Sequence, residues 1–145
     1  RCVYAGDLFQ AGIGSCSLTD IAVSVLATVI AHRPADNVLF VDAGGLALSK
    51  DRSTQALAND CGYGLVCPVD DDQPITGMTV GTVHQEHGQI DSTLPIDFAR
   101  YPIGTQLRIL PNHVCMTAAA HPHYHVIEGL KQAQSIDLWP RCNGW

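Results

Sequence analysis

The stretch Ile21-Ala-Val-Ser-Val-Leu-Ala-Thr-Val-Ile30 decides the fold, together with Val38-Leu-Phe-Val41 and the turn sequence Arg33-Pro-Ala-Asp-Asn37 between them. Both runs are rich in β-branched residues, which favour strands, although an apolar run as long as the first is also compatible with a buried helix. Proline, aspartate and asparagine in sequence are typical of turns. We therefore expect two strands that pair as an antiparallel ribbon.

Further strands are expected at intervals of roughly a dozen residues. They cover residues 63–67, 78–83 with a bulge at Gly81, 106–110 and 124–127,. Residues 51–60 have little β character and are expected to form a loop or a short helix. Short strands that recur with turn residues between them are typical of a barrel or a sandwich. The sequence thus predicts one mainly β domain over residues 1–145, an antiparallel barrel- or sandwich-like domain with short helical segments.

Composition excludes several function classes. The chain has 145 residues, 15% of them charged, and a net charge of -6, so a nucleic-acid partner is not expected,. The longest apolar stretch, residues 21–31, is shorter than the roughly 20 residues that span a bilayer, and no targeting pattern is visible. The six cysteines form no dense framework, which favours reduced thiols and a cytoplasmic location,. Because the chain starts at Arg1, we expect a piece of a longer protein.

The sharpest local motif is Leu110-Pro-Asn-His-Val-Cys115. If this segment is extended, His113 and Cys115 leave the same face of a sheet, with Cα atoms roughly 6.5 to 7 Å apart. Zinc accepts both imidazole and thiolate, and a site with only two protein ligands keeps positions open for water or substrate, as a catalytic site does. The alternative is a buried cysteine beside a hydrogen-bonded histidine, without a metal.

A second cluster, His84-Gln-Glu-His-Gly88, follows the expected strand 78–83. Glu86 and His87 are adjacent, so they would face opposite sides in a strand but converge at a strand end or turn. They are candidate catalytic residues, and an ordinary solvated turn is the alternative. His84 is interpreted as structural, and the histidines of His121-Pro-His-Tyr-His125 as a loop with its imidazoles in water.

Lysines matter because a Schiff base with a cofactor aldehyde requires one. Lys50 and Lys131 are the only two in the sequence. Lys50 lies in a polar loop, where nothing nearby would desolvate and activate its amine, and Lys131 follows an apparent turn. No cofactor-binding residue is therefore assigned in this chain.

Several segments, taken in order, resemble the D-serine dehydratase and D-threonine aldolase family, whose catalytic barrel is related to alanine racemase. The resemblance runs along almost the entire chain. The matching pieces are Tyr4, Asp7 and Gln10, Asp42-Ala-Gly44, Ala47-Leu-Ser49, Gly62-Tyr-Gly64, Gln85-Glu-His-Gly88, Pro102 and Gly104, Pro111-Asn-His-Val-Cys115, and Trp139-Pro-Arg-Cys-Asn-Gly-Trp145.

The resemblance implies a two-part, usually homodimeric enzyme with an N-terminal α/β barrel that carries the pyridoxal 5'-phosphate lysine. This chain resembles only the C-terminal β domain, in which His113 and Cys115 match the two metal ligands. Cysteine at position 115 resembles the dehydratase pattern and suits zinc, whereas aldolase-type relatives tend to carry aspartate and a harder metal. The implied reaction converts D-serine, a small D-hydroxy-amino acid, to pyruvate and ammonia. Retro-aldol cleavage to glycine and an aldehyde is the alternative.

Two non-enzymatic alternatives stay open. One is a stand-alone β module that binds a metal or a partner protein. The other is a purely structural domain with His113 and Cys115 buried and metal-free.

Overall fold

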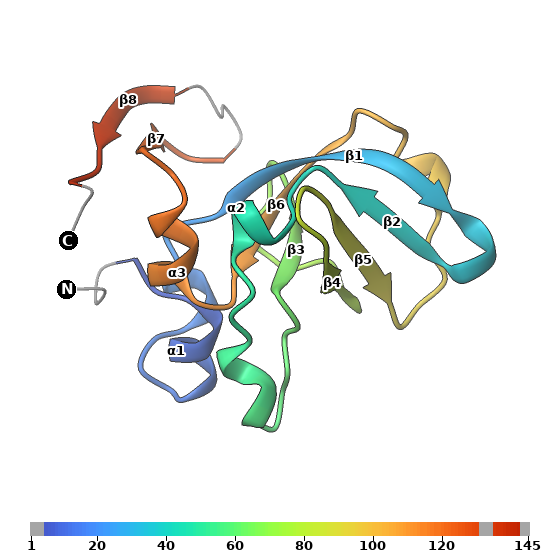
Figure 1. The fold of residues 1–145 in the computed structure, drawn as a ribbon, viewed down its shortest axis with the longest axis horizontal. Coiled ribbons are helices and arrows are strands. Elements are labelled where there is room, and N and C mark those ends of the chain that lie inside the picture. Colours follow the sequence, from blue (N-terminus) through green and yellow to red (C-terminus); the bar gives the residue numbers. More distant parts are fainter. Residues whose placement is uncertain (1–4, 131–134, 143–145) are drawn as a thin grey trace.

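A closed barrel of six strands forms the body of the molecule (Figure 1). The computed structural model describes residues 5–130 and 135–142. Every neighbouring pair of barrel strands is antiparallel, in the spatial order β1-β2-β5-β4-β3-β6 with β6 closing on β1. The strands are β1 (Val25–Arg33), β2 (Val38–Val41), β3 (Gly64–Pro68), β4 (Met78–Val83), β5 (Gly88–Ser92) and β6 (Gln106–Pro111).

The β1–β2 ribbon is confirmed, with Val29 opposite Val41 and Arg33 opposite Val38. Its turn is the short 3-10 helix η3 (Pro34–Asp36), after which Asn37 adopts the left-handed conformation at φ 57°. The Asn37 side chain also holds the loop after β5, since it donates to the carbonyl of Leu94 at 2.9 Å and accepts the Ile96 N–H at 2.8 Å. The first strand begins at Val25, four residues later than the start of its apolar run.

The barrel interior is the hydrophobic core. The alternation of side chains along each strand sends every second residue inward, and β-branched and leucine side chains fill the space. Seven of them have no measurable exposure, namely Val29, Leu39, Val41, Val66, Val80, Ile90 and Ile109. The expected bulge at Gly81 is confirmed by a register shift between Val80 and Thr82 in the β4–β5 pair.

Short helices gather near one end of the barrel (Figure 1). They are α1 (Leu8–Gly12), α2 (Gly45–Leu48) and α3 (Val114–Ala119). The remaining single turns are 3-10 helices, η2 (Leu18–Asp20), η4 (Ser53–Ala56) and η5 (Phe98–Arg100). Beside α3 lies a separate antiparallel hairpin of β7 (His123–Ile127) and β8 (Ser135–Pro140). None of the helices in the described ranges is long and apolar enough to cross a bilayer.

The structure confirms the mainly β barrel class and corrects the path of the chain after β6. Residues 110–115 are not one extended segment, because β6 ends at Pro111 and α3 begins at Val114. Strand β7 confirms the strand expected at 124–127, so His123 and His125 lie in a strand and not in the loop expected for the histidine segment. Strands β5 and β8 and helix α1 were not expected. Lys131 lies outside the described residues.

Candidate metal centre

His113 is the N-cap residue, immediately before the first residue of α3, with an extended backbone at φ -137° and ψ 102°. Its side chain makes no capping hydrogen bond. Instead the carboxylate of Asp7 accepts the N–H of Val114 at 3.0 Å, which satisfies one of the open donors at the start of the helix,. Asp7 itself is 1% exposed and also accepts the N–H of Gln10 at 2.8 Å. This arrangement leaves the His113 imidazole available for other contacts.

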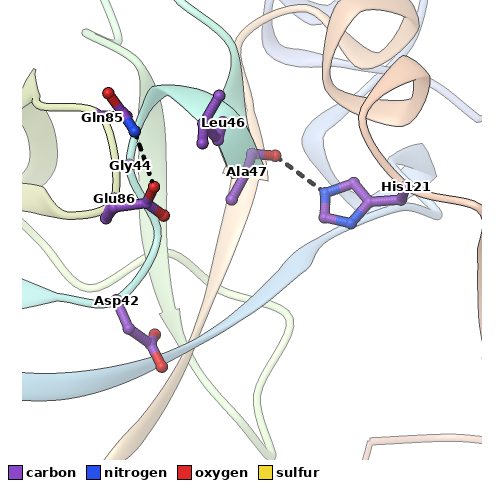
Figure 2. Close-up of a pocket in the computed structure, with 7 residues that line it drawn as sticks. All are labelled: Asp42, Gly44, Leu46, Ala47, Gln85, Glu86 and His121. Atoms are coloured by element: carbon purple, nitrogen blue, oxygen red, sulfur yellow. Dashed lines mark hydrogen bonds between the residues drawn. The ribbon is translucent and has the colours of Figure 1, made fainter.

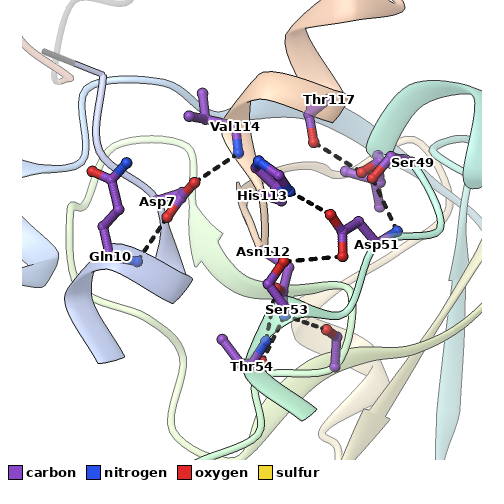
Figure 3. Close-up of polar contacts among 12 residues, drawn as sticks. Asp7, Gln10, Ser49, Asp51, Ser53, Thr54, Asn112, His113, Val114 and Thr117 are labelled. Carbon is purple, nitrogen blue, oxygen red and sulfur yellow. Dashed lines mark hydrogen bonds and ion pairs between the residues drawn. The ribbon is translucent and has the colours of Figure 1, made fainter. Parts of the chain in front are cut away.

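The imidazole of His113 pairs with the carboxylate of Asp51 through Nδ1 and Oδ2 (Figure 3). The loop holds that carboxylate in turn, because the Ser53 hydroxyl donates to Oδ1 at 3.0 Å and the Asp51 N–H donates to Ser49 Oγ at 3.2 Å. The hydrogen bond with His113 lowers the pKa of Asp51 below its ordinary value, although partial burial acts in the opposite direction,. The contact therefore favours the ionised form of the Asp51 carboxyl.

Asn112 fastens the Asp51 loop to the end of β6 (Figure 3). It is 1% exposed, and its amide donates to Thr54 Oγ1 at 2.7 Å and to the carbonyl of Gly62 at 2.6 Å. Its Oδ1 accepts the N–H of Thr54 at 3.2 Å. On the other side of His113, the hydroxyl of Thr117 in α3 donates to the carbonyl of Leu48 in α2 at 2.8 Å. The segments that carry His113 and Asp51 are thus tied to each other at both ends.

Cys115 is half-buried in the first turn of α3. The expectation that strand alternation places His113 and Cys115 on one face is wrong, because Cys115 is helical while His113 is extended. The segment Val114-Cys-Met-Thr-Ala-Ala119 contains good helix formers, and the Asp7 carboxylate caps it,. Their joint ligation of a metal therefore rests on the resemblance and on donor chemistry, not on the geometry of a strand.

The donor types present are those of a metal site that the chain would ligate incompletely. A metal-binding histidine typically hydrogen-bonds through its other ring nitrogen to a carboxylate or carbonyl, and His113 Nδ1 contacts the Asp51 carboxylate in this way,. Thiolate and imidazole are both ligands of zinc. Within residues 5–130 and 135–142, no group of three or more His, Cys, Asp and Glu side chains comes together in a way that would hold an ion. An ion held by His113 and Cys115 would therefore have positions left for water, substrate or another part of a larger protein.

Glu86 and His87 diverge in the turn between β4 and β5. The exposed Glu86 carboxylate accepts the Gln85 side-chain amide at 3.0 Å and lines a shallow pocket (Figure 2). The other lining residues are Asp42, Gly44, Leu46, Ala47, Gln85 and His121. His87 instead stacks on His84, with ring centroids 4.5 Å apart, and meets the edge of Phe40 at 6.0 Å. The structure thus puts Glu86, but not His87, on the pocket wall.

His121 was expected to project into water. Its Nε2 instead lies 3.0 Å from the carbonyl oxygen of Ala47, so it ties the end of α3 to α2 beside the same pocket (Figure 2). No sequence signal links positions 47 and 121, which are 74 residues apart. Lys50 is exposed at the end of the segment that follows α2.

The chain is similar to known proteins along almost its entire length. The family described as "Putative serine dehydratase domain" matches residues 22–127, which is most of the chain. The chain belongs to this family. The chain is 42% identical over 143 residues to D-threo-3-hydroxyaspartate dehydratase of Delftia sp., covering 96% of the chain and 37% of that enzyme. It is 42% identical over 134 residues to D-serine dehydratase of Dictyostelium discoideum, covering 87% of the chain and 32% of that enzyme.

Solved structures agree with the fold. The Delftia enzyme superimposes with a TM-score of 0.87 at 40% identity, over 97% of the chain and 37% of that structure. D-threonine aldolase from Filomicrobium marinum is more distant, with a TM-score of 0.58 and 26% identity over 83% of the domain and 27% of that structure. The chain therefore spans about a third of the length of the dehydratases it matches. By contrast, an uncharacterised Mycobacterium tuberculosis protein is 30% identical over 137 residues, which is 92% of both chains.

Proposed function

We propose that this chain is the metal-binding part of a D-amino-acid dehydratase that depends on zinc and pyridoxal 5'-phosphate. The observation that carries the proposal is the pairing of His113 Nδ1 with Asp51 at the start of α3, which leaves the second ring nitrogen for an ion,. The two dehydratases that are 42% identical to the chain give the reaction class.

The spacing of the proposed ligands has a parallel in solved structures of D-threo-3-hydroxyaspartate dehydratase. One of them is the metal-free form of a cysteine-to-alanine mutant, and another is a histidine-to-alanine mutant. The two substituted positions are two residues apart, as His113 and Cys115 are here. We propose zinc because a thiolate is a soft ligand.

In the proposed reaction, D-serine loses water to give aminoacrylate, which then takes up water and hydrolyses to pyruvate and ammonia. Bound pyridoxal phosphate supplies an electron sink for the α-carbon, and a bound divalent ion supplies polarisation of the substrate hydroxyl. In this chain, His113 and Cys115 would hold the ion. Glu86 and His87 remain candidates for a proton carrier, and Glu86 is better placed because its carboxylate is exposed in a pocket. The cofactor lysine would come from an N-terminal barrel, and the complete protein would be a cytoplasmic homodimer.

Dehydration is favoured over retro-aldol cleavage. Over the matched residues the two dehydratases are 42% identical to the chain, whereas the aldolase structure is 26% identical. Cysteine at position 115 points in the same direction, since a harder metal would prefer an oxygen ligand.

The test uses the complete gene product, assayed with D-serine, D-threo-3-hydroxyaspartate and D-threonine. We expect pyruvate or the corresponding keto acid from the first two, loss of activity with a chelator, and recovery with zinc. His113→Ala should abolish recovery, while the matched control His125→Ala, an exposed residue of β7, should not. Full turnover by His113→Ala would refute the metal assignment, and cleavage of D-threonine to glycine would favour the aldolase.

A second candidate is a separately encoded metal- or partner-binding module. The observation that favours it is the mycobacterial relative, of which the matched region covers 92%, so domain-length members of the family exist. Reading the coding sequence upstream of Arg1 separates the candidates: an in-frame barrel with a lysine after its first strand favours the enzyme, and a start codon next to Arg1 favours the module.

A further inference from the structure

The geometry points to Asp51 as a positioning residue that fixes the tautomer of His113, so that Nδ1 carries the proton and Nε2 presents its lone pair. This role deepens the proposed function, because the lone pair on Nε2 is what a metal would bind. The tautomer itself, however, is a property of the metal-free chain and can be measured without an ion.

The chemistry of the two side chains determines the direction of the hydrogen bond. An ionised carboxylate has only acceptors, so the hydrogen between Asp51 Oδ2 and His113 Nδ1 must belong to the ring,. A neutral imidazole carries one N–H, and when this N–H is on Nδ1, Nε2 is unprotonated. Metal ligation requires a neutral imidazole with a free lone pair. Asp51 therefore selects the ring form that can ligate through Nε2.

The Asp51 carboxylate is held in place before any metal arrives. Ser53 and Ser49 fix its side chain and its backbone N–H, as described above. Ser49 adopts a positive φ of 70°, which non-glycine residues rarely do, and its own N–H donates to the carbonyl of Gly45 at 3.0 Å,. The next turn is anchored by Thr54 on Asn112. Both ends of the Asp51 loop are thus fastened to the barrel end that carries His113.

Two other histidines show the opposite arrangement. His32 Nε2 lies 2.7 Å from the carbonyl oxygen of Tyr101, and His121 Nε2 lies 3.0 Å from that of Ala47. A carbonyl oxygen only accepts, so both rings must be protonated on Nε2. His113 is instead held through Nδ1. The molecule therefore contains its own internal controls for the tautomer.

The experiment measures ring tautomers by two-bond ¹H–¹⁵N correlation in the ¹⁵N-labelled 145-residue chain, at a pH where the histidines are neutral. We expect the Nδ1–H form for His113 and the Nε2–H form for His32 and His121. Asp51→Ala should convert His113 to mainly Nε2–H. Asp51→Asn should retain Nδ1–H, because the amide oxygen still accepts. Asp36→Ala, an exposed carboxylate in the β1–β2 turn, is the matched control and should change nothing.

The second readout is zinc affinity, measured by competition with a chromophoric chelator. We expect Asp51→Ala to weaken binding by about 10- to 100-fold, with a smaller loss in Asp51→Asn. Circular dichroism confirms that each variant is folded, and Ser53→Ala, which removes one donor to Asp51, gives a milder variant if Asp51→Ala does not fold.

The outcomes separate this inference from the proposed function. An Nε2–H tautomer for His113 in the wild-type chain overturns the inference, and so does zinc binding of equal strength in wild type and Asp51→Ala. If the wild-type chain shows the Nδ1–H tautomer, Asp51→Ala shifts it, and any zinc binding by the wild-type chain is weakened in Asp51→Ala, the inference stands. Absence of zinc binding by that same wild-type chain would then count against the proposed function only.

Discussion

Asn112 holds the two segments of the candidate site together through buried hydrogen bonds. Its amide group makes three hydrogen bonds, two to residue 54 and one to the carbonyl of Gly62, in a position that is 1% exposed. A buried polar group is stabilising only when its partners are present, and removing one partner leaves the others unsatisfied. Asn112 therefore connects the strand end that precedes His113 to the loop that carries Asp51.

Asn112→Ala should lower the free energy of unfolding by about 3 kcal/mol, because it leaves the Thr54 N–H and the Gly62 carbonyl buried without their partner,. Urea denaturation followed by circular dichroism measures the change. Asn59→Ala, an exposed residue of the same loop, is the control and should change the unfolding free energy by about 0.5 kcal/mol or less,. Equal effects of the two substitutions would show that the Asn112 network is not structural.

Asp60 should make the stability of the fold depend on pH. Burial raises its pKa, but hydrogen bonds from Arg52, from the Gly62 N–H and from Thr54 Oγ1 together bring the pKa below its ordinary value. A carboxyl whose pKa is lower in the folded state stabilises the fold above its unfolded pKa of about 3.9, and this contribution is lost as the pH falls through the folded pKa.

Asp60→Asn should therefore reduce the difference in unfolding free energy between pH 7 and pH 3, measured by urea denaturation at both values. Asp70→Asn is the control, because it also removes one negative charge, but from an exposed turn. It shows how far the loss of one charge alone changes the pH dependence of the unfolding free energy. The interpretation fails if Asp60→Asn keeps the full pH dependence of the wild type.

At the scale of elements, helix α2 is held by backbone contacts with the β4–β5 turn. The Gly45 N–H donates to the carbonyl of His84 at 2.7 Å, and the Leu46 N–H to that of Gln85 at 3.2 Å. A Cβ atom at Gly44 would lie 2.4 Å from the His87 nitrogen and 2.6 Å from the carbonyl oxygens of residues 84 and 85. These are backbone atoms, which cannot turn away as the end of a side chain can.

Gly44→Ala should consequently destabilise the fold by about 2 kcal/mol, since overpacking against backbone forces the two segments apart. Gly45→Ala is the matched control, because its Cβ would be no closer than 3.3 Å to its neighbours. Thermal denaturation of both variants compares them directly. A melting temperature for Gly44→Ala equal to that of Gly45→Ala would contradict the close contact.

The sequence predicted those elements whose signal lies within a few residues. Strands β1, β2, β4 and β6 are rich in β-branched and apolar residues, and Gly81 marked the bulge. Strand β5, Gly-Gln-Ile-Asp-Ser, has a single large apolar residue and no such signal. Helix α3 is six residues long, too short for a helical period, and its cap comes from Asp7, 107 positions away.

The candidate site could be predicted only in part for the same reason. His113 and Cys115 stand in a recognisable motif, but the partner of His113 lies 62 positions earlier, at Asp51. Nothing near Asp51 in the sequence distinguishes it from other aspartates in polar loops. Contacts of this range arise from the closure of the barrel, which places the loop before β3 beside the end of β6.

At the scale of the whole molecule, stability comes from the closed barrel core. Leu39 is fully buried within it, whereas Leu46 is 58% exposed on α2. Leu39→Ala should lower the free energy of unfolding by about 3 kcal/mol through lost burial and the cavity left behind, and Leu46→Ala should change it by about 0.5 kcal/mol or less. The denaturant midpoints of the two variants test this prediction. Similar midpoints would contradict the claim that the barrel interior is the main source of stability.

Barrel closure has a consequence for deuterium uptake. Because β6 returns to β1, each barrel strand has a neighbour on both sides, and its ladder amides can exchange only when the whole sheet opens,. The β7–β8 pair has two outer edges, and every residue of β8 is exposed. The amides of the β7–β8 hairpin should therefore exchange through local fraying, long before those of the barrel. Among the described strands, this hairpin is thus the pair that can rearrange against a neighbouring surface without opening the barrel.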